Sequence, residues 1–405
     1  MLSVSGGVCA AKGFKASGIH CGIRKNKTKR DLSLIISEQK AAAAAVYTTN
    51  LVKGAPIAVT RKNIADGYAQ AVICNSGNAN TCNANGEEIA TAMCALTEQY
   101  AGVKAEDVIV ASTGVIGQPL DITPIAGGME ELVAALSDDG SLAAAEGIMT
   151  TDTRVKEIAF EFMAGGKPCR IGGIAKGSGM IHPNMATMLV FITSDVAIEP
   201  ALLRAALSED VKDSFNMVSV DGDTSTNDMC CVMANGMAGN DMIADADSAD
   251  FLEFKKALFA VTSYLCRNIA RDGEGATHLM QVEVSGAADK ETARVVAKSV
   301  CCSSLLKAAI FGADANWGRV LCAIGYSGAD LDVTKIDVDF ASSAGQIAVC
   351  RQGSGVDFSE EKAKEILLCE EVRILISLGE GSAEATAWGC DLTYDYVKIN
   401  GDYRT

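Results

Sequence analysis

Apolar, strand-like runs alternate with helical runs in the first part of the chain, and this alternation most limits the folds open to it. Strand-like runs occur at 71–74 (AVIC) and 108–111 (VIVA), and a helical pattern over 86–100 separates them. A further helical pattern surrounds Glu130 to Ala135. The alternation predicts a mixed α/β or α+β chain in which helices cover sheets.

The second part of the chain shows the same mixture. A strand-like RIGGIA at 170–175 leads into a glycine-rich turn and then into a second apolar strand. Helical patterns follow near 201–214, 249–271 and 359–369, strands near 279–285 and 371–378, and an alternating, strand-like DLTYDYVKIN at 391–400.

Composition excludes several classes of function. With 405 residues, 49% of them hydrophobic, the chain can bury a sizeable core in two or three subdomains. The formal net charge of −16 repels phosphate backbones and anionic lipid surfaces, so neither nucleic acid nor a membrane is expected as a partner. The N-terminus lacks a signal-peptide pattern and no run is long enough for a membrane span, so a cytoplasmic location is expected.

Cysteine and histidine usage argues against a metal centre. The fifteen cysteines are scattered among apolar neighbours without a CxxC pair, as expected of reduced, buried thiols. The three histidines are too dispersed for a histidine-based site. The acidic run SVDGDTSTNDM departs from a calcium-loop spacing, and its Asp221, Asp223 and Asp228 are interpreted as turn and capping groups. No metal is expected.

One threonine stands where a glycine-rich turn meets an apolar strand. In KGSGMIHPNMATMLVFIT, Thr187 follows Ala186 directly. A β-branched residue at this place is commonly an ordinary strand residue. Alternatively, Thr187 attacks the carbonyl of Ala186, the chain is cut, and the new α-amine serves as the base for the hydroxyl of the same residue. The pattern alone leaves both interpretations open.

The segment KGSGMIHPNMATML resembles the self-cleavage and active-site signature of the ornithine acetyltransferase (glutamate N-acetyltransferase, ArgJ) family. Other blocks similar to that family appear in family order over roughly residues 6 to 405, among them AVICNSGNANTCN, VIVASTGVIGQPL, IMTTDTRVKE, ARDGEGATHLMQVEVSGA and ISLGEGSAEATAWGCDLTYDYVKINGDYRT. Each block is weak by itself, but together they are highly specific.

The resemblance implies particular roles for particular residues. Thr187 becomes the nucleophile and Ala186/Thr187 the cleavage site, and Thr113 with Gly114 becomes the oxyanion hole that acyl transfer requires. Lys176 suits an α-carboxylate and Glu274 a side-chain ammonium. The other implied substrate contacts are Thr150, Thr151, Asn400 and Thr405.

The resemblance also implies the fold and the reaction. The fold is the α/β fold of the DmpA/ArgJ-like enzymes, with mixed sheets and helices, cut into two interleaved pieces: an α chain of residues 1–186 and a β chain of residues 187–405 that assemble as (αβ)₂. The reaction is acetyl transfer from N²-acetyl-L-ornithine to L-glutamate in arginine biosynthesis, through an acetyl-threonine ester. No cofactor is expected, and acetyl-CoA is left open as a second donor.

Two departures from the family pattern and two alternatives remain. Val155 stands where proline is usual, and His278 stands where a lysine or arginine is common, so the substrate preference is less fixed than the reaction type.

The chain could also be an N-terminal-nucleophile amidohydrolase or aminopeptidase, with water as acceptor, or a ligand-binding relative that never cleaves. Label transfer from acetylornithine to glutamate separates the first from a transferase, and a single 42 kDa band would favour the second.

Overall fold

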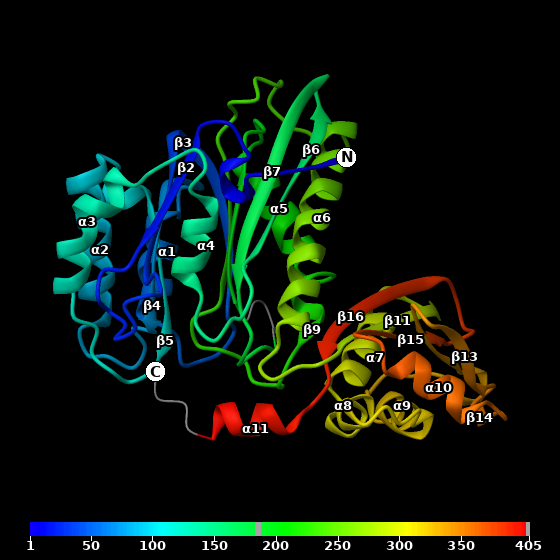
Figure 1. Ribbon diagram of the computed structural model, residues 1–405. Coiled ribbons are helices and arrows are strands. Elements are labelled where there is room, and N and C mark those ends of the chain that lie inside the picture. The colour runs from blue at the N-terminus through cyan, green and yellow to red at the C-terminus, as the bar shows by residue number, and fades with distance from the viewer. Residues whose placement is uncertain (183–187, 402–405) are drawn as a thin grey trace.

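The computed structural model describes residues 1–182 and 188–401. Figure 1 shows two layered bodies, each built on one sheet, with α11 below and between them. Ala186, Thr187 and Thr405 lie outside the described residues. None of the described helices is long and apolar enough to cross a membrane.

The larger sheet is mixed and draws its strands from both sides of residues 183–187. Its strands, from edge to edge, are β1 (Leu2–Val4), β6 (Lys156–Ala164), β7 (Lys167–Lys176), β8 (Leu189–Ser194), β10 (Met229–Ala234), β3 (Leu32–Tyr47), β4 (Tyr68–Asn78) and β5 (Val108–Val115), with β2 (Phe14–Ile19) paired to β3. Strand β8 runs antiparallel to β7 and parallel to β10, and β10 runs antiparallel to β3. Strands β8 and β10, from after residues 183–187, therefore lie between two groups of strands from before them: β1, β6 and β7 on one side and β3, β4 and β5 on the other.

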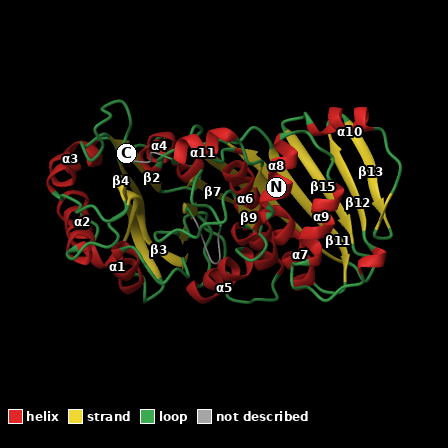
Figure 2. Ribbon diagram, turned by 90° about the horizontal axis from the view of Figure 1, so that it is seen from below, coloured by secondary structure: helices red, strands yellow, loops and turns green. Residues whose placement is uncertain are grey.

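Helices cover both faces of this sheet (Figures 1 and 2). They are α1 (Ala55–Asn63), α2 (Gly86–Ala101), α3 (Thr123–Ala134), α4 (Ser141–Ile148), α5 (Pro200–Asp210) and α6 (Ala249–Arg271). Three clusters of buried apolar side chains fill the spaces: one beneath α2 and α3, one beneath α4, and one that includes α5 and α6.

Helix α6 connects the two bodies. Its hydroxyl cap Ser248 accepts a hydrogen bond from the amide of Phe251, and its apolar residues recur every three or four positions on one buried stripe, as at Phe254, Leu258 and Leu265. The stripe packs against β6 and β7 of the larger sheet, and the helix also contacts strands of the smaller one. One apolar cluster therefore runs through both bodies.

The smaller sheet carries its own helices on the right of Figure 1. Its strands are β14 (Ser354–Gly355), β13 (Gly345–Arg351), β12 (Asp337–Ser342), β15 (Glu371–Ser377), β11 (Leu279–Ala287), β16 (Ala383–Cys390) and β9 (Val218–Ser219). Its helices are α7 (Lys290–Cys302), α8 (Ser304–Phe311), α9 (Trp317–Gly325) and α10 (Glu360–Leu367). The mixed α/β class predicted from the sequence is confirmed.

The prediction of a strand over residues 391–400 is wrong. The segment forms α11 (Tyr394–Asn400), because Thr393 Oγ1 accepts a hydrogen bond from the amide of Tyr396 and Asp395 lies in the first turn. The short alternating pattern is compatible with a helix once a cap sets its start. Asn400 is the last residue of α11, and its Nδ2 donates a hydrogen bond to Glu274 Oε2 at 2.7 Å.

Candidate active site

A cavity of about 120 Å³ brings together residues from seven separate parts of the chain. Seven predicted positions line it: Thr113, Gly114, Thr150, Thr151, Lys176, Glu274 and Asn400. The remaining lining residues are Ala79, Ile116, Gly179, Met180, Ser225, Thr226 and Asn227. The described chain resumes beside this cavity, since the carbonyl of Met188 accepts a hydrogen bond from the amide of Met229, just after the lining loop.

Thr113 and Gly114 lie in the last residues of β5, where an irregular turn within the strand needs a glycine. Gly114 has φ of +133°, and a Cβ there would lie 2.3 Å from the carbonyl carbon of Gly77 and 2.5 Å from the amide nitrogen of Asn78. Both contacts are with backbone, which side-chain rotation cannot relieve. The parallel pairing of β4 and β5 is irregular at the same point. The irregular pairing redirects the backbone of this turn toward the cavity.

Hydrogen bonds from Asn227 connect this turn to residues on other sides of the cavity. Its Nδ2 donates to the carbonyl oxygens of Ser112, at 2.9 Å, and of Ala79, at 2.5 Å. Its Oδ1 accepts from the hydroxyls of Thr81 and Thr226. The side chain is buried and its hydrogen-bonding groups are used, so it fixes the turn rather than standing free for a ligand. The sequence pattern predicted turn and capping roles for Asp221, Asp223 and Asp228 of this segment, and no role for Asn227.

Asp152 organises the side of the cavity that holds Lys176. Its Oδ2 accepts from the amide of Thr150 at 3.0 Å, and its Oδ1 accepts from the amide of Gly177 at 2.7 Å. Burial alone would raise the pKa of Asp152, but the cations Lys156 and Lys176 hold that pKa below its usual range. Asp152 therefore stays ionised and orients the threonine loop beside the Lys176 ammonium, which is itself 8% exposed.

A buried ion triad lies behind this wall and was not predicted. Lys156 Nζ lies 2.7 Å from Asp152 Oδ1 and 2.6 Å from Asp272 Oδ2, and all three side chains are nearly inaccessible. Asp272 also accepts hydrogen bonds from the amides of Thr153 and Arg154. The only sequence signal was the i, i+4 spacing of Asp152 and Lys156, and nothing in the pattern pointed to Asp272. The triad joins the loop at 150–154 to the end of α6.

Glu274 is placed by its neighbours on three sides. Its amide donates to the carbonyl of Ser178 at 2.9 Å, and its Oε2 accepts from Asn400 Nδ2 at 2.7 Å. A Cβ at Gly179 would lie 2.4 Å from the Glu274 carboxyl carbon, so the glycine-rich turn leaves the space that this carboxylate occupies. The side chain is 8% exposed and faces the cavity. It offers a fixed negative charge to a cationic ligand group.

The acidic run contributes a brace and an unusual buried carboxyl. Asp221 accepts from the amides of Met180 and Ile181, as expected for a capping group. Asp228 is 2% exposed, and its Oδ2 has no hydrogen-bond partner within the described residues. Burial raises the pKa of the Asp228 carboxyl well above its ordinary value, although Lys176 opposes this.

His278 is not among the residues that line the cavity. Its Nδ1 lies 3.0 Å from Asp391 Oδ2.

Comparison with known proteins gives one consistent result. The ArgJ family model matches residues 15–405. Among curated proteins, the arginine biosynthesis bifunctional protein ArgJ 1 of Clostridium acetobutylicum is 50% identical, over 97% of this chain and 96% of its own. The arginine biosynthesis bifunctional protein ArgJ of Symbiobacterium thermophilum is 52% identical, over 99% of each.

A solved structure is also similar. The arginine biosynthesis bifunctional protein ArgJ from Bacillus halodurans has 47% sequence identity and a TM-score of 0.50, and the match covers 52% of this chain and 97% of that one. The similarity in sequence therefore extends along nearly the whole chain, and it includes the segments that line the cavity.

Proposed function

The chain belongs to the ArgJ family, and from this premise we propose that it is an acyltransferase of arginine biosynthesis that moves the acetyl group of N²-acetyl-L-ornithine to L-glutamate. The observation that carries the proposal is the convergence of Thr113, Gly114, Lys176, Glu274 and Asn400 in one small cavity. They come from β5, β7, the turn after α6 and α11, so their meeting follows from the fold and not from proximity in sequence.

The proposed chemistry begins with Thr187, which lies outside the described residues. Its Oγ attacks the acetyl carbonyl of acetylornithine while its own α-amine takes the hydroxyl proton. Backbone and hydroxyl donors at Thr113 and Gly114 stabilise the oxyanion. The tetrahedral intermediate expels the ornithine α-amine, which receives the proton, and an acetyl-threonine ester remains. The α-amine of glutamate then attacks this ester, and the same groups act in reverse order.

The charged side chains suit the two amino acids. Lys176 offers an ammonium for the α-carboxylate that both substrates carry. Glu274 offers a carboxylate for the side-chain ammonium of ornithine, and Asn400 holds that carboxylate in place. Thr150 and Thr151 present hydroxyls to the remaining polar groups, and Thr151 Oγ1 lies 2.6 Å from Ser178 Oγ. Thr405 stays a predicted contact outside the described residues.

The free α-amine requires a cut between Ala186 and Thr187, which gives pieces 1–186 and 187–405. Strand β8 of the second piece lies between β7 of the first and β10 of the second, and β3 of the first pairs with β10. The pieces would therefore remain joined in one sheet. We further propose an (αβ)₂ assembly located in the cytoplasm, where free amino acids are the substrates.

Donor choice forms a separate part of the proposal. The reaction as written needs no resident cofactor, because the threonine supplies both nucleophile and base. The two curated relatives named above are called bifunctional in their own names. We propose acetyl-CoA as a second acetyl donor, acting as a substrate and not as a bound group.

Intact mass with N-terminal sequencing tests the cut, and label transfer tests the reaction. We expect two polypeptides, the second starting at Thr187, and transfer of labelled acetyl from acetylornithine to glutamate without matching free acetate. Thr187→Ala should abolish both cleavage and transfer, whereas Thr334→Ala, at a distant 3₁₀ turn, should change neither. An active, uncut protein would contradict the mechanism, and stoichiometric release of acetate would make the chain a hydrolase.

A further inference from the structure

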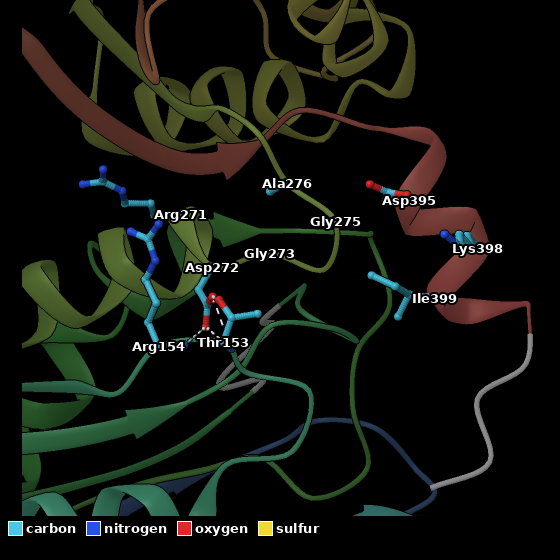
Figure 3. Close-up of a pocket in the computed structure, with 10 residues that line it drawn as sticks. All are labelled: Thr153, Arg154, Arg271, Asp272, Gly273, Gly275, Ala276, Asp395, Lys398 and Ile399. Atoms are coloured by element: carbon cyan, nitrogen blue, oxygen red, sulfur yellow. Dashed lines mark hydrogen bonds between the residues drawn. The ribbon is translucent and has the colours of Figure 1, made fainter.

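A second, larger cavity of about 470 Å³ is lined in part by Gly273 and Gly275, the two neighbours of Glu274 in sequence (Figure 3). This volume is within the range of small-molecule sites. Its lining residues are Thr153, Arg154, Arg271, Asp272, Gly273, Gly275, Ala276, Asp395, Lys398 and Ile399. The proposed reaction places no substrate there, so the cavity has no assigned role.

The lining is richer in cations than the chain as a whole. Three cationic residues, Arg154, Arg271 and Lys398, face two carboxylates, Asp272 and Asp395, in a protein whose formal net charge is −16. Figure 3 shows the two arginines on one side of the cavity and Asp395, Lys398 and Ile399 of α11 on the other. A local excess of positive charge in an acidic protein favours an anionic ligand.

Ion pairs outside the cavity make this excess clearer. Lys156 neutralises Asp272 at 2.6 Å, and Arg271 is paired with Glu370 at 2.7 Å and with Glu371 at 3.3 Å. In the described part of the chain, neither Arg154 nor Lys398 has a carboxylate within 4.0 Å. Among the described residues that line the cavity, Arg154 and Lys398 are therefore offset only by Asp395, which leaves an excess of one positive charge.

The same two loops supply lining residues to both cavities. Thr150 and Thr151 line the catalytic cavity, and Thr153 and Arg154 line the second one. Glu274 likewise faces the first, and its neighbours Gly273 and Gly275 face the second, so Cα atoms of the two linings are about 3.8 Å apart across each peptide bond. A ligand in the second cavity would contact the same loops that place Glu274 and the threonines.

We propose that this second cavity is a binding site for a phosphate-class anion, held between Arg154 and Lys398 and coupled to the catalytic cavity through the shared loops. Asp395 offsets one of these two positive charges, and a phosphate group offsets the other, while its several oxygens can accept hydrogen bonds from cations on both sides of the cavity. Guanidinium and ammonium groups are the usual protein donors to phosphate oxygens. Binding itself is independent of the proposed function, and only the coupling rests on it.

Inorganic pyrophosphate is the probe for binding, measured by calorimetry on the whole protein at about 0.15 M salt, where long-range charge effects are screened. The variant Arg154→Glu with Lys398→Glu should raise the dissociation constant about tenfold or more. The matched control is Lys62→Glu with Lys364→Glu, which makes the same charge change on α1 and α10. No binding to the wild type, or equal loss in both double variants, overturns the proposal.

The phosphate group could belong to a phosphorylated acetyl donor or to a free effector, and kinetics separates the two. If pyrophosphate competes with acetyl-CoA and leaves acetylornithine-dependent transfer unchanged, the site holds the phosphates of the donor. If it changes kcat with acetylornithine as donor, the site holds a free effector. Binding without effect on either reaction overturns the coupling. A wild type that binds pyrophosphate but transfers no acetyl group from acetylornithine contradicts the proposed function alone.

Discussion

Replacing Gly114 with alanine tests whether the turn at the end of β5 holds the oxyanion. The added Cβ would lie 2.3 Å from the Gly77 carbonyl carbon, whereas carbon atoms in contact are about 3.5–4.0 Å apart. The backbone must therefore move by roughly 1 Å, and a misplacement of this size near reacting groups can cost about 10²-fold in rate. With loss of one oxyanion donor, kcat should fall about 10²–10³-fold.

Gly117→Ala is the matched control for this change. Gly117 also has a positive φ, +78°, but a Cβ there meets nothing within 4 Å. Both variants incur about 1–2 kcal/mol for the left-handed backbone, and only Gly114→Ala adds roughly 1–3 kcal/mol of overpacking.

The assay measures kcat and KM for transfer from acetylornithine to glutamate, together with the thermal midpoint of each variant. Gly114→Ala should lower kcat far more than Gly117→Ala, with a smaller change in KM. Similar kcat values for the two variants, or a rise in KM alone, would refute the oxyanion assignment.

Three further predictions concern charged groups. Burial raises the pKa of Asp210 to about 7, so this residue lowers the stability of the native state as pH rises from about 4 through 7. In thermal melts, the stability of Asp210→Asn relative to wild type should increase by roughly 2 kcal/mol between pH 5 and pH 8. Parallel stability profiles of the two proteins would contradict this. Glu274→Gln should raise KM about tenfold more for acetylornithine than for glutamate, because only the former carries a side-chain cation, and equal losses would make the residue structural. Lys156→Met should destabilise the protein by about 3–5 kcal/mol in urea titrations, because two buried carboxylates lose their cation. The exposed control Lys62→Met should change the free energy of unfolding by about zero, and a small effect at Lys156 would show that the triad is weak.

Sequence patterns predicted most regular elements because their periodicity is local. The helices at 86–100 and 249–271 and the strands at 279–285 and 371–378 are confirmed as α2, α6, β11 and β15. The alternating pattern at 391–400 indicates a strand, but ten residues are too few for the period to be decisive. The helix is set by the cap at Thr393, whose hydrogen bond forms only in the folded chain.

In the candidate site, too, some residues could be predicted from the sequence and others could not. Family resemblance selected Thr113, Lys176 and Glu274, and these residues do line one cavity. It could not supply contacts between distant parts of the chain, such as Lys156 with Asp272, 116 residues apart, or Asn227 with Ser112, 115 residues apart. Such contacts depend on which loops the tertiary fold brings together.

The position of β8 has a consequence for the timing of the proposed cut between Ala186 and Thr187. The strand is hydrogen-bonded on both edges, to β7 from before the cut and to β10 from after it. Two pieces made from separate genes would each expose unpaired strand edges and apolar faces, which favour aggregation. The proposed maturation would therefore follow folding, with the one-piece precursor acting as its own template: the uncut chain keeps both halves at high effective concentration until the sheet closes.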